Sequence, residues 1–381
     1  MIVDSILMWN IRLLYRLDWR LILVISALMV ISLLIISATD ASVTENFFFT
    51  PKTFSQFKRI LLGWGVFFLF AAMDYNKIRE WSLLLYILMV LSLLGLFFVP
   101  AIQNVHRWYR VPLIGISLQP SEYAKLIVVI ALSWFLEKNK SSASSLQTAC
   151  AACAIVALPF LLILKQPDLG TALVLCPVTL IMFYLGGLHR GMMRFMGISG
   201  FVALVLISLI FSGVFSHEKM RPYAIQVLKE YQYERLNPHN HHQWASQTAI
   251  GVGGVLGSGW RSSEFTGRGW LPYAHTDSVF PAFGEEFGLL GLIILLILFY
   301  SLIYFGFQVT AVAKDYFGRM LSAGITVFVA MHILVNIGMM CGLLPITGVP
   351  LVLVSYGGSS IFVTMAALGI LQSIYVRRFM F

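Results

Sequence analysis

Three carboxylates crowd one short stretch of the chain, and their residue types suit acid–base chemistry. Residues 271–288 include Asp277, Glu285 and Glu286, although the 381 residues hold only 17 acidic side chains. A carboxylate that reaches a substrate hydroxyl can act as a general base, and Asp277 is our candidate for that role. The structural alternative is an N-cap, in which Thr276 or Asp277 accepts the first free N–H groups of the following helix. Capping would not exclude catalysis.

The composition places these carboxylates in a membrane protein. Apolar residues make up 59% of the chain and charged residues only 11%, whereas a soluble domain has about 25% charged residues. Apolar stretches of about 20 residues each predict transmembrane helices. The ten predicted spans are roughly 19–39, 57–74, 80–99, 120–136, 146–164, 169–187, 192–214, 285–308, 317–341 and 353–375. We therefore expect an all-α polytopic membrane protein that forms a single domain over residues 1–381.

The distribution of Lys and Arg predicts how the chain crosses the membrane. If the N-terminus is cytoplasmic, the inside segments carry 13 of these residues and the short outside connections carry 6, as the positive-inside rule requires. Both termini are then cytoplasmic, and residues 216–284 form one long extracytoplasmic loop between helices seven and eight. Met1–Arg20 lacks a cleavable signal pattern, so the first span is expected to act as a signal anchor. Orientation and anionic lipids account for the net charge of +9, so no nucleic acid is implied.

A charged pair opens the fourth span. Glu122 and Lys125 are three residues apart, so they share one helix face and can pair. A pair at membrane depth is costly and is expected to face a protein-lined cavity. Two interpretations stay open: a structural ion pair that fixes helix packing, or a Lys125 that binds an anion in a lipid-open cavity, oriented by Glu122. Upstream, Arg107 beside Trp108 is either part of an interfacial anchor or a ligand for a lipid phosphate.

Other polar turns flank the spans. Asp168 precedes span six and is a plausible N-cap. Ser355 and Ser359 lie where the last span opens; small residues there allow close helix packing, and free N–H groups offer an anion site as the alternative. Glycines between Gly251 and Gly259 predict a flexible, closely packed loop without a nucleotide fingerprint. The four cysteines lie in or at the ends of spans and predict no disulfide framework. No pattern requires a cofactor, although a divalent cation is compatible with the site.

Taken together, these motifs resemble those of the SEDS proteins (shape, elongation, division, sporulation), the polytopic glycosyltransferases of bacterial cell-wall synthesis. The resemblance runs from Asp18 to Arg378. Its motifs are Gln119–Leu126, Gln166–Thr171, Ala249–Gly254, His275–Gly288 and Gly342–Ser360. Residues 336–339 and 344–348 resemble the elongation branch, RodA, rather than the division branch, FtsW. The chain departs from the usual pattern at Tyr273, where the family usually has Glu, and at residues 278–279, which follow the aspartate.

The resemblance implies a peptidoglycan glycosyltransferase that polymerises lipid II on the outer face of the bacterial cytoplasmic (inner) membrane during cell elongation. In the family, the aspartate at the position of Asp277 is essential for that reaction. A class B penicillin-binding protein, which is a transpeptidase, is the implied activating partner, together with other membrane proteins of the elongation complex. The residues expected to bind lipid II, an undecaprenyl pyrophosphate disaccharide-peptide, are Arg107, Glu122, Lys125, His275, Thr276, Ser355 and Ser359.

The reaction requires only one carboxylate. A sugar hydroxyl needs a base, whereas pyrophosphate already leaves well and needs cations rather than the second carboxyl of a glycoside hydrolase. Asp277 without a second nucleophile predicts inversion at the anomeric carbon. The main alternative is a lipid II flippase or transporter, since ten spans with intramembrane charge also fit that class; a scaffold that recruits wall enzymes is another. An enzyme requires Asp277, whereas a transporter would depend more on Glu122 and Lys125.

Overall fold

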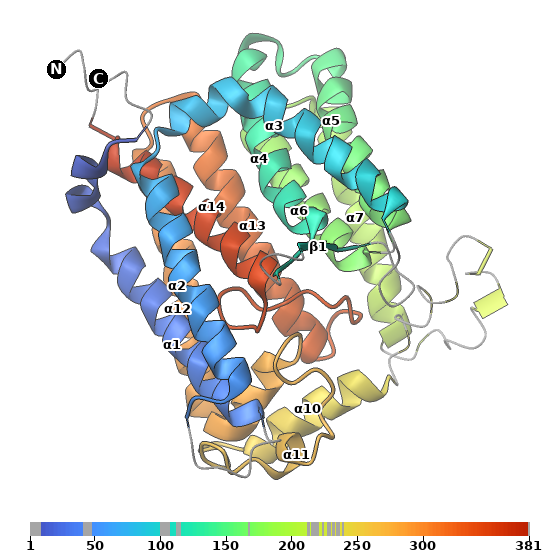
Figure 1. Ribbon diagram of the computed structural model, residues 1–381. Coiled ribbons are helices and arrows are strands. Elements are labelled where there is room, and N and C mark those ends of the chain that lie inside the picture. Colours follow the sequence, from blue (N-terminus) through green and yellow to red (C-terminus); the bar gives the residue numbers. More distant parts are fainter. Residues whose placement is uncertain are drawn as a thin grey trace.

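The protein is a bundle of long helices (Figure 1). The computed structural model describes residues 9–40, 48–99, 107–111, 116–166, 168–211 and 240–379, with a few short pieces between 214 and 237. Helices lie at all ten predicted spans: α1 (Trp19–Thr39), α2 (Pro51–Ala72), α3 (Tyr75–Gly95), α4 (Pro120–Lys138), α5 (Leu146–Lys165), α6 (Leu169–Leu185), α7 (Arg190–Phe211), α12 (Val279–Val312), α13 (Tyr316–Met340) and α14 (Gly358–Val376). Seven helices of the described residues are long and apolar enough to cross a membrane. The chain is therefore membrane-integral, while the count of ten spans stays a prediction.

Several helices begin earlier than their apolar runs suggested, because capping residues set the helix starts. The Thr50 side chain accepts a hydrogen bond from the Thr53 N–H, and Pro51 occupies the first turn of α2. Asp74 caps α3 by accepting from the Asn76 N–H. The first turns of both helices are polar, so hydropathy alone places the starts too late. A side chain that accepts one of the unpaired N–H groups stabilises such a start by about 1 kcal/mol.

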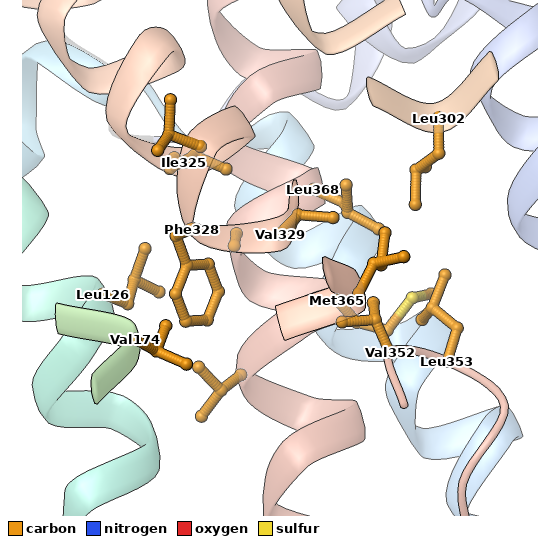
Figure 2. Close-up of a cluster of buried hydrophobic side chains, with 14 of the residues drawn as sticks. Leu126, Val174, Leu302, Ile325, Phe328, Val329, Val352, Leu353, Met365 and Leu368 are labelled. Atoms are coloured by element: carbon orange, nitrogen blue, oxygen red, sulfur yellow. The ribbon is translucent and has the colours of Figure 1, made fainter. Parts of the chain in front are cut away.

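Helix α13 is the centre of the bundle and packs against α4, α6, α12 and α14. Figure 2 shows Phe328 and Val329 of α13 among apolar side chains of these neighbours, including Leu126 of α4 and Met365 of α14. All four side chains are buried, with exposed fractions of 7% or less. Because α13 is enclosed on nearly all sides, its polar residues must find partners inside the protein.

The first and last described helical segments meet at the same end of the bundle. Gln372 of α14 accepts a hydrogen bond from the Asp18 N–H at 3.0 Å and donates one to the Asp18 carbonyl at 3.1 Å. This arrangement agrees with the expectation that both termini lie on one side of the membrane. The short 3-10 helices η2 (Ile11–Arg16), η3 (Leu96–Phe98) and η4 (Lys140–Ser142) complete the helical elements of the first half.

A small hairpin interrupts the all-α architecture. Strands β1 (Tyr109–Val111) and β2 (Ile116–Leu118) pair antiparallel, with Arg110 opposite Ser117. The hairpin lies between α3 and α4, in the connection predicted to be outside. The sequence analysis did not predict it, because two strands of three residues carry almost no periodic signal.

The segment predicted as a long loop is partly helical. Helix α10 (His241–Gly253) lies across one end of the bundle, with the short helix α11 (Glu264–Gly267) beside it (Figure 1). Helix α12 begins at Val279, inside the predicted loop, and bends at Gly288, where φ is 63° and ψ is −165°. The helix thus begins before the predicted loop ends, while the position of the loop relative to the membrane stays a prediction. Most of residues 216–239 lie outside the described part of the chain.

The glycine-rich segment after α10 is pinned to the bend of α12, so its predicted close packing is confirmed, while its flexibility stays a prediction. The Ser258 N–H donates to the Glu285 carbonyl at 2.8 Å, and the Leu289 N–H donates to the Gly254 carbonyl at 2.9 Å. A Cβ atom on Gly257, whose φ is +83°, would lie 2.3 Å from the Glu286 carbonyl oxygen. Glycine is required there both for the left-handed backbone and for the close approach of two chain segments.

We predict that Gly257→Ala destabilises the protein by about 2 kcal/mol or more, because positive φ and backbone overlap both penalise a Cβ atom. The measurement is thermal unfolding of the purified protein in detergent. Gly251→Ala is the matched control, since a Cβ at Gly251 meets nothing within 4 Å. Equal unfolding temperatures for the two variants would show that the glycine segment is not held against α12.

Candidate active site

Asp277 lies in a tight turn just before α12. The N–H groups of Thr276 and Ser278 both donate to the Tyr273 carbonyl, at 2.9 and 3.2 Å, and Tyr273 itself has a φ of +52°. The N-cap position of α12 is Ser278, whose side chain does not cap the helix and instead lies 2.6 Å from His242 Nε2. The structural alternative, a cap at Thr276 or Asp277, was therefore wrong.

Two other parts of the chain hold the Asp277 turn from the sides. The Asn336 side chain of α13 donates to the Asp277 carbonyl at 2.9 Å and to the Val349 carbonyl at 2.7 Å. The Ser355 hydroxyl donates to the Thr276 carbonyl at 2.6 Å. The Asp277 side chain is half-buried, and a Cβ on the neighbouring Gly348 would lie 3.4 Å from Asp277 Oδ2. The carboxylate is thus carried on a fixed backbone, as a catalytic base requires.

An arginine that the sequence analysis counted only as an orientation charge lies near this turn. The Arg59 guanidinium of α2 stacks over the Tyr356 ring at 4.2 Å. The Tyr356 N–H donates to the His275 carbonyl at 2.8 Å, and the His275 ring meets Tyr356 edge-on at 5.8 Å. Arg59 Nη1 is buried and has no hydrogen-bond partner among the described residues. A buried cationic donor without an acceptor is costly and indicates that a negative group belongs there.

His275 itself supplies no positive charge to the site. Burial lowers the pKa of the His275 imidazole below its ordinary value, and the nearby Lys52 ammonium lowers this pKa further against the opposing effect of Asp40. Lys52 and Asp40 form an ion pair at 3.0 Å. A lowered pKa favours the neutral form of the His275 ring, which contacts Tyr356 edge-on.

The predicted pair of Glu122 and Lys125 is confirmed, with Lys125 Nζ 2.8 Å from Glu122 Oε1. The predicted opening to a lipid-exposed cavity is wrong for Lys125, whose side chain is 2% exposed. A third member, His332 of α13, lies 2.6 Å from Lys125 Nζ through Nε2. Because His332 Nδ1 lies 2.9 Å from the Phe328 carbonyl, which can only accept, Nδ1 carries the ring proton and Nε2 accepts from Lys125.

The expected cap Asp168 is confirmed and gathers several polar groups at the start of α6. Its carboxylate accepts hydrogen bonds from the Ser121 hydroxyl at 2.7 Å and the Thr171 hydroxyl at 3.0 Å. Burial on its own would raise the pKa of the Asp168 carboxyl, but the Arg107 guanidinium, these hydrogen bonds and the Lys125 charge together hold that pKa below its ordinary value. The charge of Lys125 thus acts on Asp168 at the start of α6 even though its side chain is buried.

The remaining predicted ligands are largely engaged within the fold. Arg107 Nε donates to the Gln166 carbonyl at 3.0 Å and so helps to fix the turn between α5 and α6. The Ser355 hydroxyl accepts from the Leu351 N–H at 2.7 Å while it donates to Thr276, so the prediction of Ser355 as a substrate ligand is not supported. Ser359 accepts from the Gln119 N–H at 3.2 Å. The Thr276 hydroxyl faces the Tyr273 carbonyl at 3.3 Å.

Glu285 and Glu286 stand apart from Asp277 in role. Glu285 is fully buried and accepts from the Phe265 N–H at 2.8 Å and the Thr266 N–H at 3.0 Å. Glu286 accepts from the Ser263 hydroxyl at 2.7 Å and from the Arg261 N–H. Both carboxylates are therefore structural anchors for the segment around α11, which leaves Asp277 as the catalytic candidate of the three.

The part of the chain that the structure describes offers no cluster of residues for a bound metal. Within the described ranges, no group of three or more His, Cys, Asp or Glu side chains is close enough to hold a metal ion. His239 lies outside those ranges. His242 contacts Ser278, so it does not join His241 in a shared site. A divalent cation that enters with a pyrophosphate substrate stays compatible with the site.

A family model, a curated relative and solved structures all match this chain over nearly its whole length. The family model for the FtsW, RodA and SpoVE cell cycle proteins matches residues 12–379. The peptidoglycan glycosyltransferase MrdB of Escherichia coli K12 is 32% identical over 368 residues, covering 95% of this chain and 94% of that protein. Among solved structures, the rod shape determining protein RodA of Thermus thermophilus has a TM-score of 0.69 at 24% identity, covering 96% of this chain and 98% of that chain. A chain from a peptidoglycan synthase complex that coordinates polymerization and crosslinking has a TM-score of 0.75 at 23% identity, covering 96% of this chain and 99% of that chain.

We predict that Glu122 stabilises the protein mainly by compensating the buried charge of Lys125. Glu122→Leu leaves Lys125 charged and unpaired, which costs about 3–5 kcal/mol. The double substitution Glu122→Leu with Lys125→Met removes both charges and is expected to restore much of that stability. Thermal unfolding of both variants in detergent provides the comparison. If the double variant is no more stable than Glu122→Leu, a buried unpaired lysine is not the cause of the loss.

Proposed function

Since this chain belongs to the FtsW/RodA/SpoVE family of cell cycle proteins, we propose that it polymerises lipid II on the outer face of the bacterial cytoplasmic membrane. The chain is a peptidoglycan glycosyltransferase, which is also the activity given in the names of relatives that align with nearly its whole length. It is close to RodA, the branch that the sequence predicted. The flippase alternative is not favoured. We further propose that both termini are cytoplasmic and that elongation is the process it serves.

The observation that carries the proposed mechanism is the fixed position of Asp277. Its turn is held by α13 through Asn336 and by the residues before α14 through Ser355. In the proposed reaction, the 4-hydroxyl of one sugar attacks the anomeric carbon of the next, and Asp277 accepts the hydroxyl proton. The new C–O bond forms as the bond from the anomeric carbon to pyrophosphate breaks. A single displacement of this kind inverts the anomeric configuration.

The leaving pyrophosphate needs positive charge, and Arg59 supports that role better than the cations first predicted. Its Nη1 is buried without a partner among the described residues, whereas Lys125 is paired with Glu122 and His332. A planar guanidinium matches two phosphate oxygens at once. The stack on Tyr356, whose N–H bonds the His275 carbonyl, links the position of Arg59 to the turn that carries Asp277.

A partner is also part of the proposal. A chain from a peptidoglycan synthase complex, in which polymerization and crosslinking are coordinated, shares this fold. We propose that a class B penicillin-binding protein binds this chain and that other elongation-complex membrane proteins join it. The pinned glycine segment argues against a loop that the partner must order. A partner would act instead on the set of helices that hold the Asp277 turn.

We predict that Asp277→Asn lowers polymerisation of purified lipid II by about two to four orders of magnitude, because it removes a general base. The substitution keeps the backbone carbonyl that Asn336 binds, so the unfolding temperature should not change. Glu80→Gln, at an exposed carboxylate paired with Lys77, is the control and should polymerise normally. Polymerisation by Asp277→Asn within a few-fold of the unmodified chain would exclude Asp277 as the base. Lipid II transport without any polymer would favour the flippase instead.

We also predict that Arg59→Gln lowers kcat/KM for lipid II about tenfold to a hundredfold, the cost of losing a charged hydrogen bond of about 1.5–3 kcal/mol. The assay is polymer formation at several lipid II concentrations. Lys58→Gln is a matched control, because Lys58 is adjacent in α2 but exposed and packed on Phe54. Equal kcat/KM values for the two variants would contradict a role for Arg59 in binding the pyrophosphate.

A further inference from the structure

A concave aromatic surface is formed by the start of α10 and the segment between α11 and α12, away from the groups used above. This aromatic cleft has a volume of about 560 Å³ and is lined by His241, Trp244, Phe265, Gly269, Trp270 and Pro272. That volume falls within the range of about 300–1,000 Å³ that is common for small-molecule sites. Trp244 is 57% exposed and Trp270 is 50% exposed, so two large rings stand open at a position where folding alone would favour covering them.

The rings of the cleft do not cover one another's faces. Phe265 is 8% exposed and forms the floor, and both tryptophans meet it edge-on, at 6.3 Å for Trp244 and 5.5 Å for Trp270. His241 is tilted against Trp244 at 6.0 Å. None of these pairs stacks face to face, so no ring covers the flat face of another.

Polar groups stand at the edge of the same cleft. The Arg268 guanidinium lies over the Trp270 ring at 5.1 Å and forms an ion pair with Glu264 at 3.2 Å. The ring nitrogens of His241 add a further hydrogen-bonding group. The surface therefore combines flat apolar faces with donors and acceptors at the rim, which a hydrocarbon chain would not use.

The aromatic cleft is built into the same rigid segment as Asp277. Trp270 and Pro272 lead directly into the turn that carries Asp277, and His241 precedes His242, whose Nε2 lies 2.6 Å from the Ser278 hydroxyl. His242 and Tyr273 also pack together at a ring distance of 5.7 Å. The cleft and the Asp277 turn are therefore linked through neighbouring residues that contact one another.

We propose that the aromatic cleft binds sugar rings of the glycan strand, that is, β-1,4-linked N-acetylated amino sugars. This inference rests on the proposed function. A pyranose ring presents a face of C–H groups, which packs on an aromatic ring, and an edge of hydroxyl and amide groups, which needs polar partners. The cleft offers both, and since Asp277 is not among the residues that line it, it suits sugars beyond the reacting pair rather than the reacting pair itself.

A membrane-interface role for the same tryptophans is the competing explanation. Interfacial tryptophans form belts at the level of the lipid headgroups, and such a belt needs neither a concave surface nor an ion pair at its rim. The aromatic cleft is concave and lies beside Glu264 and Arg268. These features favour a sugar over a lipid headgroup.

The first test measures binding to the full chain in lipid nanodiscs. The probe is a β-1,4-linked N-acetylglucosamine hexasaccharide, observed by saturation-transfer NMR and titrated by tryptophan fluorescence. We expect Trp244→Ala with Trp270→Ala to weaken binding about tenfold, since each ring contributes about 0.5–1.5 kcal/mol. Trp270→Tyr should keep most of the affinity because it preserves a ring. Trp81→Ala, at an exposed tryptophan of α3, should have no effect.

The second test is the length of the product made from lipid II, resolved on gels. Loss of the two rings should shorten the strands, because a growing strand held at the cleft stays attached for more additions. Unchanged hexasaccharide affinity in the double alanine variant would overturn the proposal, as would quenching of these tryptophans by brominated lipid without any response to the sugar. If the unmodified chain binds the sugar at the cleft but makes no polymer, the proposed function fails while the cleft remains a sugar site.

Discussion

One side-chain amide holds the site together. Asn336 of α13 donates one hydrogen bond to the Asp277 carbonyl and another to the Val349 carbonyl, so it joins the turn before α12 to the connection between α13 and α14. Neither segment belongs to a regular element at that point, and loops that lack such ties are mobile. The amide is fully buried, where hydrogen bonds are not weakened by competing water. The orientation of Asp277 therefore depends on a residue of the central helix.

Helix α13 also carries His332, a hydrogen-bond partner of the buried Lys125. His332 lies one turn before Asn336 and accepts from Lys125, whose other close partner is Glu122. Residues four apart lie on one helix face, so a single face of α13 contacts both the buried charge and the candidate base. A charge is retained at this depth only when its partners are fixed. The arrangement ties α4 and α13 in one relative position through the contacts of Lys125.

The sequence predicted the parts of this site that depend on local spacing. Asp277, the pair of Glu122 and Lys125, and the cap at Asp168 each follow from neighbours within a few residues. His332 and Asn336 were missed, although polar residues inside an apolar span are themselves a signal of function, because their partners are distant in sequence. Arg59 was read as an orientation charge for the same reason.

Two features needed the three-dimensional structure before they could be interpreted. Clustering in the sequence shows only that Glu285 and Glu286 are close to Asp277 along the chain; the N–H groups near α11 that donate to these two carboxylates become apparent only in three dimensions. The glycines of the segment 251–259 allow flexibility in an isolated chain, yet glycine also permits close backbone approach. In the folded protein the second property dominates, and the segment is bonded to the bend at Gly288.

The distribution of unpaired polar atoms argues that the fold is shaped around a ligand rather than only around itself. Among the described residues, four buried side-chain atoms lack a hydrogen-bond partner: Gln56 Oε1, Arg59 Nη1, Ser82 Oγ and Asn336 Oδ1. Three of these four belong to residues that contact the turns at Asp277 and Tyr356, since Gln56 donates to the Ser355 carbonyl, Arg59 stacks on Tyr356 and Asn336 holds Asp277. Buried polar groups are otherwise almost always satisfied. A donor and two acceptors are thus left over on residues that hold the turns at Asp277 and Tyr356, which is the complement expected for a ligand that brings both hydrogen-bond acceptors and donors.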